Sequence, residues 1–159
     1  RAVARQIATA NAPRLEDFPA RTSDKLRYGD TDRQGHVNNA VYSTFFETGR
    51  VEMLHAGDVP PPEGKAFVIA RVTIDFQREV NWPGEVEIGT GVAAIGNSSI
   101  RLRQALFQNG RICASAESVI VLMDEATRRS TPLPDAMRAK LAGHLIAGAE
   151  AAKDTAGGG

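Results

Sequence analysis

Asp32 is the residue in this chain best placed to do chemistry. It stands in the segment 28–54, where a strand end, two aspartates and a Gly-centred turn lead into an aromatic-rich helix. The first backbone amides of a helix have no hydrogen-bond acceptor within the helix, and they form the positive end of the helix dipole. A carboxylate that can attack or take a proton, close to donors that can hold an oxyanion, is the minimum equipment for acyl transfer.

The helix that follows must hold this carboxylate in place. We expect it to begin near Asn38, a good N-cap type, and to stop at His55 and Gly57. Its apolar face recurs at helical spacing and comprises Tyr42, Phe45, Phe46, Gly49 and Met53. Gly49 would cost about 1 kcal/mol relative to alanine unless the helix lies close against a sheet.

The rest of the chain changes to the period-two pattern of strands. Strands are predicted at residues 25–28, 68–80, 86–95, 100–108 and 111–123, and a C-terminal helix at 135–146. Asn109-Gly110 is a strong hairpin signal between the last two strands. One long helix followed by an antiparallel meander predicts an α+β fold, with a curved sheet wrapped around a central helix. Long exposed sheet edges invite pairing, so we expect a homodimer joined edge to edge.

Composition places the chain among ordinary globular proteins. The formal net charge is zero, so the sequence shows no excess of positive charge that would indicate binding to nucleic acid or to a membrane surface. No apolar run reaches the length of a membrane span, and a cytoplasmic location is the expectation. The single cysteine, Cys113, excludes an intrachain disulfide and is expected to be a buried, inert thiol. We expect a poorly ordered arm at 1–20, a single domain at 21–150 and a flexible tail at 151–159.

Several motifs occur in an order that resembles a known family. The most specific is D-T-D-x-x-G-H-V-N-N-x-x-Y at 30–42. Weaker pieces are V-T-I-D-F at 72–76, P-G-E-V-E at 83–87, I-G-N-S-S at 95–99 and T-R-R-S-T-P-L-P at 127–134. Over residues 25–134 the chain resembles the hotdog-fold acyl-CoA thioesterases of the 4-hydroxybenzoyl-CoA thioesterase type.

The resemblance implies roles for the residues of the first motif. Asp32 would be the catalytic carboxylate, either as a general base for water or as a nucleophile that forms a mixed anhydride. Asn39 would supply a backbone N–H that polarises the thioester carbonyl, and Gly35 would allow the tight turn that aims this amide. The family also implies active sites at the dimer interface, with the substrate, acyl-CoA, lying across both subunits.

No cofactor or metal is expected. Thioester hydrolysis needs no metal, because the thiolate leaves readily and the carbonyl is already electrophilic. A metal site made of Asp30, Asp32 and His36 lacks a further ligand. A calcium loop starting at Asp30 fails because its twelfth position would be Val41 instead of glutamate. We interpret Asp30 as mainly structural.

The sequence leaves the role of His36 open. It can orient the loop, bond the substrate, act as a second acid or base, or only satisfy backbone groups at the turn. Several residues proposed to bind substrate have an alternative interpretation as well. Tyr42 can be a core residue, Glu47 can form a surface ion pair with Arg50, and the arginines can belong to a charged sheet surface. These candidates are Tyr42, Glu47, Ser98, Ser99 and Arg101, with Arg103 and Arg111 beside the last as further phosphate ligands.

Two other functions compete with thioester hydrolysis. A hotdog enoyl-thioester hydratase uses an Asp–His pair spaced five apart with a proline between, whereas Asp32 and His36 are four apart with no proline. A non-catalytic acyl-thioester binding protein is the second, and the intact aspartate argues against it. The acyl group, the choice of CoA or acyl carrier protein, and the choice of dimer or tetramer stay open.

Overall fold

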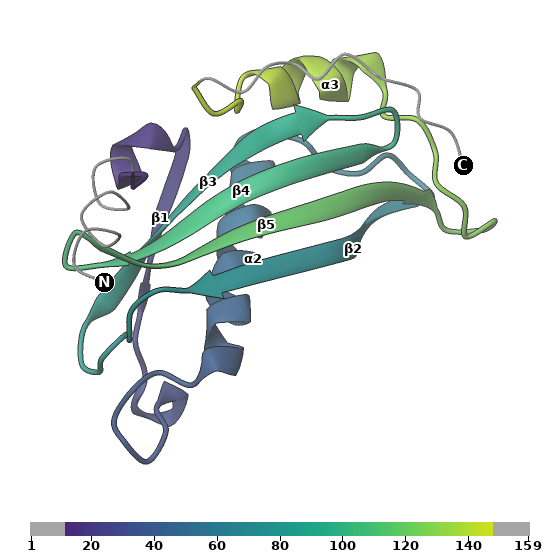
Figure 1. Cartoon of the computed structure of the whole chain (residues 1–159). Helices are drawn as coiled ribbons and strands as arrows, with labels where there is room; N and C mark the ends of the chain where they lie inside the picture. The colour runs from purple at the N-terminus through teal and green to yellow at the C-terminus, as the bar shows by residue number, and fades with distance from the viewer. Residues whose placement is uncertain (1–11, 148–159) are drawn as a thin grey trace.

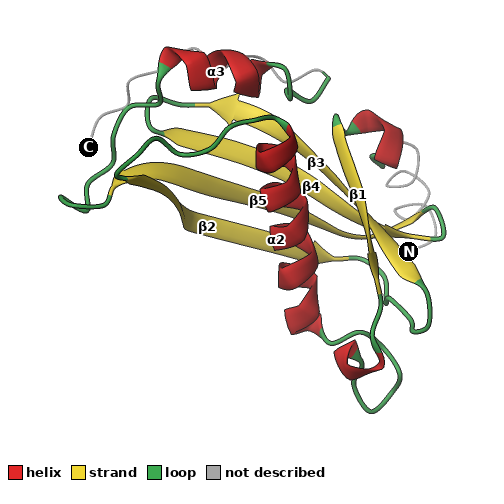
Figure 2. Cartoon of the chain, turned by 180° about the vertical axis from the view of Figure 1, so that it is seen from behind, coloured by secondary structure: helices red, strands yellow, loops and turns green. Residues whose placement is uncertain are grey.

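An 18-residue helix, α2 (Asn39–Ala56), lies across one face of an antiparallel sheet in the computed structural model, which describes residues 12–147 (Figures 1 and 2). The five strands are β1 (Ala20–Lys25), β2 (Lys65–Phe76), β3 (Glu85–Ile95), β4 (Ser99–Gln108) and β5 (Arg111–Asp124). A short helix, α3 (Asp135–Ala142), packs over one end of β3, and the 3-10 turns η1 (Leu15–Asp17) and η2 (Tyr28–Asp30) flank β1. The predicted α+β architecture is confirmed.

The strand order β1-β3-β4-β5-β2 places β1 and β2 at the two edges of the sheet. The β4–β5 hairpin turns at Asn109 and Gly110, both with positive φ (51° and 76°), as the sequence predicts. Helix α2 packs mainly on β1, β3 and β4. The helix-facing side chains near the β2 edge are therefore left half-exposed, among them Ile69, Val72 and Phe76.

Gly49 explains how closely the helix approaches the sheet. A Cβ at this position would stand 2.7 Å from Ile88 Cγ2 and 2.8 Å from both Gln104 Nε2 and Thr90 Oγ1. The expectation that Gly49 marks a close helix–sheet contact is confirmed. Around it, Phe45 and Phe46 are almost fully buried and fill the main core.

The first predicted strand was misplaced. Residues 20–25, and not 25–28, form β1, which pairs with β3. Tyr28–Asp30 instead forms the turn η2, because the Asp30 carboxylate accepts the backbone N–H of Arg27 at 2.9 Å. The structural role predicted for Asp30 agrees with its burial and with this hydrogen bond.

Three other element boundaries differ from those predicted. Strand β2 begins at Lys65 and not at Val68. Strand β2 ends at Phe76, because the backbone amides of Gln77 and Arg78 both donate hydrogen bonds to the Cys113 carbonyl oxygen. Helix α3 ends at Ala142, after which the His144 carbonyl and the Ile146 amide bond to Val92 of β3. The remaining strands lie within one residue of their predicted bounds.

The domain boundaries stay predictions. Residues 1–11 of the expected arm and the whole tail at 151–159 lie outside the described residues. Between 12 and 20, Phe18 is buried and its ring packs edge-on against Phe107, with the ring centroids 6.4 Å apart. Among residues 12–147, no helix is long and apolar enough to cross a membrane.

Candidate active site

The loop between η2 and α2 is a small hairpin that presents Asp32. Two hydrogen bonds join its two sides. The Asp32 amide donates to the His36 carbonyl at 2.8 Å, and the Gly35 amide donates to the Asp32 carbonyl at 3.1 Å. Gly35 has φ of +79°, in the left-handed region that favours glycine. This φ fits the tight turn that the resemblance implies for Gly35, and the role of the turn in aiming the Asn39 amide stays a prediction. The Val37 amide joins the hairpin to the chain after β2 by donating to the Val80 carbonyl at 2.8 Å.

The carboxylate of Asp32 is oriented by backbone amides. Its Oδ1 atom accepts the N–H of Gln34 at 2.8 Å and the N–H of His36 at 3.2 Å. Among residues 12–147, no donor lies within hydrogen-bonding distance of Oδ2. The side chain is exposed, so one oxygen is fixed by the turn and the other is free to meet a water molecule or a substrate.

The first residue of α2, Asn39, lines the same cavity as Asp32. Asn38 caps the helix as predicted: its side-chain oxygen accepts the Ala40 amide at 3.1 Å and its carbonyl accepts the Val41 amide at 2.9 Å. The amide of Asn39 has no acceptor among the described residues. Asp32 and Asn39 both line one open cavity of about 350 Å³.

His36 is held by a different carboxylate. Its Nε2 atom lies 3.1 Å from Oε2 of Glu79, and its backbone pairs with Asn81. The Asp–His side-chain pair that a hotdog hydratase requires is therefore absent within this described loop: the ring of His36 meets Glu79 and the carboxylate of Asp32 meets amides. This arrangement favours the interpretation of His36 as a residue that orients the loop.

Tyr42 is a core residue that also lines the cavity. Its hydroxyl accepts the Val80 amide at 3.2 Å and donates to the Arg78 carbonyl at 3.3 Å. Burial raises the pKa of this phenol, and the hydrogen bond from Val80 partly opposes the rise. Phe76 packs edge-on against the ring, with the centroids 5.0 Å apart. Tyr42 thus ties α2 to the segment after β2.

Glu47 and Arg50 do not form the surface ion pair considered as an alternative. Arg50 is buried and its Nη1 lies 3.4 Å from Oε1 of Gln104, while Glu47 stays exposed on the helix. Burial lowers the pKa of Arg50, and the charge of Glu47 partly offsets this. Within the described protomer, Glu47 does not line the cavity that contains Asp32.

The remaining proposed substrate residues lie away from Asp32 in the same protomer. Ser98 and Ser99 occupy the β3–β4 turn, at the end of the sheet opposite to that loop. Arg101 and Arg103 point to the outer face, where they line a cavity of about 270 Å³ and Arg101 pairs with Glu117 at 3.3 Å. A single protomer therefore does not bring these side chains to the carboxylate.

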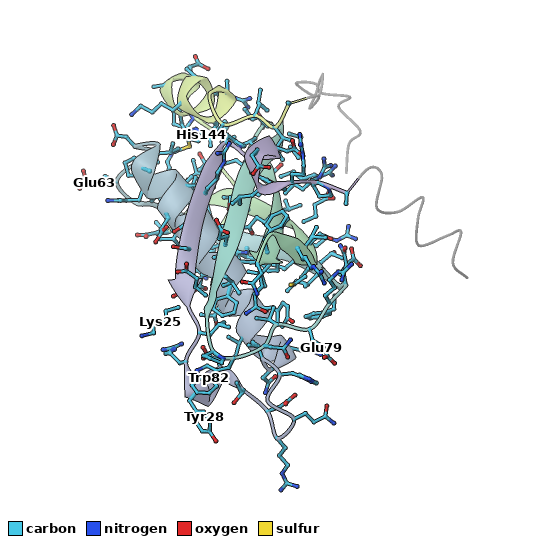
Figure 3. All side chains as sticks on the ribbon, turned by 90° about the vertical axis from the view of Figure 1, so that its left-hand side faces the viewer. Lys25, Tyr28, Glu63, Glu79, Trp82 and His144 are labelled. Carbon is cyan, nitrogen blue, oxygen red and sulfur yellow. The ribbon has the colours of Figure 1, made fainter. Side chains whose placement is uncertain are left out.

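Part of the cavity wall was not predicted from the sequence. Gln77, Arg78 and Glu79 line it, although their alternation was interpreted as the end of a strand. The signal was the cluster of polar residues before Val80, which marks the crossing of the chain toward the loop. Figure 3 shows Glu79 and Trp82 toward the end of the molecule that carries this loop.

Other candidate chemistry finds no support in the described residues. No group of three or more His, Cys, Asp or Glu side chains among residues 12–147 could hold a metal ion. Cys113 is buried as predicted, and burial raises the pKa of its thiol. A buried thiol that resists ionisation is a poor nucleophile.

The curved antiparallel sheet packed around one long helix, with a carboxylate at the start of that helix, defines the hotdog class of thioesterases. The chain belongs to the thioesterase-like superfamily, whose family model matches residues 26–141. It is a thioester hydrolase, and acyl-CoA thioesterase activity is the activity of its named relatives.

Individual relatives agree with this assignment. The acyl-CoA thioester hydrolase YbgC of Escherichia coli is 26% identical over 121 residues, which cover 73% of this chain and 90% of YbgC. A protein described as a predicted thioesterase from Bacillus stearothermophilus is 34% identical, with a TM-score of 0.73 over 79% of this chain and 96% of that one. A Thermus thermophilus thioesterase solved with coenzyme A and Zn is 31% identical, with a TM-score of 0.69 over 79% and 94%.

Proposed function

We propose that this protein hydrolyses an acyl-CoA thioester, with Asp32 as the reacting carboxylate and the backbone N–H of Asn39 as the oxyanion donor. The observation that carries the proposal is the shared cavity: it is lined by Asp32, whose Oδ2 accepts no hydrogen bond from residues 12–147, and by Asn39, whose amide has no acceptor among those residues. The relatives named as acyl-CoA hydrolases support CoA as the thiol carrier.

The chemistry follows from these two groups. Asp32 takes a proton from water as the water oxygen attacks the acyl carbon, or attacks that carbon itself to give an anhydride that water then opens. Negative charge collects on the former carbonyl oxygen, where the Asn39 amide and the positive end of α2 stabilise it. The C–S bond breaks, CoA leaves as the thiol and the acyl group leaves as a carboxylic acid.

The working unit in this proposal is a homodimer joined along β2. This edge strand is 12 residues long and has no described neighbour on its outer side. Among residues 12–147, six large hydrophobic side chains are exposed. Four of them lie on β2 or on the adjoining face of α2, namely Val51, Ile69, Val72 and Phe76. A twofold axis perpendicular to the sheet would pair two β2 strands antiparallel and cover this apolar surface.

The decisive experiment measures thiol release from a panel of acyl-CoAs by wild-type protein and Asp32→Asn. The asparagine oxygen can still accept the Gln34 and His36 amides, so the loop is expected to keep its shape. Loss of a positioned base should lower kcat by about 10²- to 10⁴-fold. The matched control is Asp135→Asn, an exposed aspartate in the first turn of α3, which should leave kcat unchanged. Turnover within a few-fold of wild type in Asp32→Asn would reject the proposed role.

A further inference from the structure

Glu79 contacts the loop of Asp32 through its side chain. Its Oε2 atom lies 3.1 Å from Nε2 of His36, and both residues line the cavity. His36 is in turn bonded to Asp32 through both of its backbone groups. Its amide donates to Asp32 Oδ1 at 3.2 Å, and its carbonyl accepts the Asp32 amide at 2.8 Å. A contact at the ring of His36 therefore acts on the backbone that holds the reacting carboxylate.

The backbone of Glu79 is fixed to helix α2. The Tyr42 hydroxyl donates to the Arg78 carbonyl at 3.3 Å and accepts the Val80 amide at 3.2 Å, so it bonds to the residue on either side of Glu79. Tyr42 is only 2% exposed and lies close behind Asn39 in α2. The carboxylate of Glu79 therefore extends from a backbone position that is fixed relative to the start of the helix.

The chain on both sides of this glutamate is also bonded to the sheet. Before it, the Arg78 amide donates to the Cys113 carbonyl of β5 at 3.0 Å. After it, the Asn81 amide donates to Gln108 Oε1 of β4 at 3.0 Å. The loop residues 31–36, in contrast, are exposed or half-exposed, so side-chain packing does little to fix them. Their position therefore depends on hydrogen bonds to segments that are held more firmly.

We propose that Glu79 is a positioning residue for thioester hydrolysis: its carboxylate holds the ring of His36 and thereby fixes Asp32 relative to the Asn39 amide. This inference rests on the proposed function. The path from Tyr42 through Glu79 and His36 to Asp32 joins the helix to the carboxylate without passing through the turn at 33–35. His36 needs only a side-chain N–H aimed at Glu79 in this role, and it transfers no proton.

Two substitutions at Glu79 test its role, with the acyl-CoA that the wild-type protein hydrolyses fastest as the substrate. Glu79→Ala should lower kcat at least about tenfold, because a misplacement of about 1 Å can cost on the order of 10²-fold in rate. Glu79→Gln should keep kcat within a few-fold of wild type, since its amide oxygen can still accept the His36 N–H. Unchanged kcat in Glu79→Ala, or equal losses in both variants, would overturn the proposal.

Stability measurements and a second ion pair provide the controls. The Glu79 side chain is 66% exposed, and exposed ion pairs add little to folding, so urea unfolding of Glu79→Ala should be nearly unchanged. Lys140→Ala breaks the exposed pair that Lys140 forms with Asp58 at 2.9 Å. This pair involves α3, which lies at the end of the molecule opposite to the start of α2 (Figure 1). Lys140→Ala should leave kcat unchanged. An equal loss of kcat in Lys140→Ala would show that the effect is not specific to Glu79 and would reject the proposal.

A double-mutant cycle tests whether Glu79 acts through His36. His36→Ala keeps both backbone groups that hold Asp32 and removes only the ring, so it should lower kcat by the same factor as Glu79→Ala. The double variant should be no slower than either single variant, because both remove one contact. Losses that multiply in the double variant would mean that Glu79 acts by another route, and the proposal would fail.

His36→Gln separates positioning from proton transfer. Glutamine offers an amide N–H to the Glu79 carboxylate, but it cannot act as an acid or a base near neutral pH. We therefore expect His36→Gln to keep kcat within a few-fold of wild type, whereas His36→Ala loses it. A His36→Gln protein as slow as His36→Ala would assign an acid–base role to the imidazole and overturn the proposal.

Hydrogen exchange without substrate separates this inference from the hydrolytic mechanism. The amides of Gln34 and His36 donate to Asp32 Oδ1, and their exchange rates report how firmly the loop is held. By NMR, both amides should exchange at least about tenfold faster in Glu79→Ala and at the wild-type rate in Lys140→Ala. If Asp32→Asn kept full turnover, the proposed role of Asp32 would fail, but faster exchange would still show that Glu79 holds the loop. Unchanged exchange in Glu79→Ala would reject the positioning role, whatever the activity of Asp32→Asn.

Discussion

The Cα atom of Gly49 faces Ile88 so closely that a methyl group on it would stand 2.7 Å from Ile88 Cγ2. The same methyl group would press on Nε2 of Gln104, which donates to the Phe46 carbonyl and to Thr90 Oγ1, both at 2.9 Å. This contact sets the distance between α2 and the sheet.

Gly49→Ala should destabilise the protein even though alanine is the better helix former. The overpacking cost of about 1–3 kcal/mol exceeds the roughly 1 kcal/mol gained in helix propensity. Urea unfolding followed by circular dichroism measures the difference. Ser43→Ala, at an exposed position of the same helix, is the control and should be neutral or slightly stabilising. A Gly49→Ala protein as stable as wild type would show that the sheet residues around Gly49 move to make room for the methyl group.

The carboxylate of Asp124 predicts a defined dependence of stability on pH. Its Oδ1 atom accepts the Ala126 amide at 3.0 Å and the Thr127 amide at 2.9 Å, just after β5. The bond from Thr127, the largest cause, lowers the pKa of Asp124, and further help comes from Ala126 and the charge of Lys65. The folded-state pKa thus lies below the unfolded value of about 3.9.

A depressed folded-state pKa stabilises the protein above the unfolded pKa, and this stabilisation is lost as the pH falls through the folded pKa. Asp124→Asn keeps an acceptor for both amides but removes the charge. Its urea midpoint should therefore lie below that of wild type at pH 7, and the two midpoints should converge as the pH falls below about 4. If the difference between the two urea midpoints stays constant down to pH 2, the charge of Asp124 does not contribute to stability.

The architecture was predictable because it depends on patterns that repeat within single elements. The aromatic spacing from Tyr42 to Met53 indicated the helix, and the placement of Gly49 within it indicated a close sheet. The strand β1, in contrast, has the sequence A-R-T-S-D-K, in which no apolar alternation is present. It is a strand because β3 offers it a hydrogen-bonding edge, and that partner is distant in the sequence.

The site was predictable only in part, for a similar reason. Asp32, Gly35 and Asn38 act through local turn and cap geometry, so the sequence around them indicates their conformation. The engagement of His36 by Glu79 joins residues 43 positions apart and follows from the path of the chain after β2. Ser98 and Ser99 lie at the end of the sheet opposite to Asp32, a placement that depends on how long β3 and β4 run and not on the local sequence.

The turn at Gly35 separates the effect of loop geometry on activity from its effect on stability. Gly35 and Gly110 have nearly the same positive φ, +79° and +76°, and neither would place a Cβ within 4 Å of another atom. Alanine at either position should cost about 1–2 kcal/mol through backbone strain alone. Gly35, however, links Asp32 to the start of α2, whereas Gly110 turns the β4–β5 hairpin.

Gly35→Ala and Gly110→Ala should therefore lose similar stability in urea unfolding but differ in catalysis. A shift of the loop would move the Asp32 carboxylate relative to the Asn39 amide, and a misplacement of about 1 Å can cost on the order of 10²-fold in rate. We expect kcat/KM for acyl-CoA to fall by at least about tenfold more in Gly35→Ala than in Gly110→Ala. Equal rates in the two variants, with equal stability, would mean that the hairpin does not position the carboxylate.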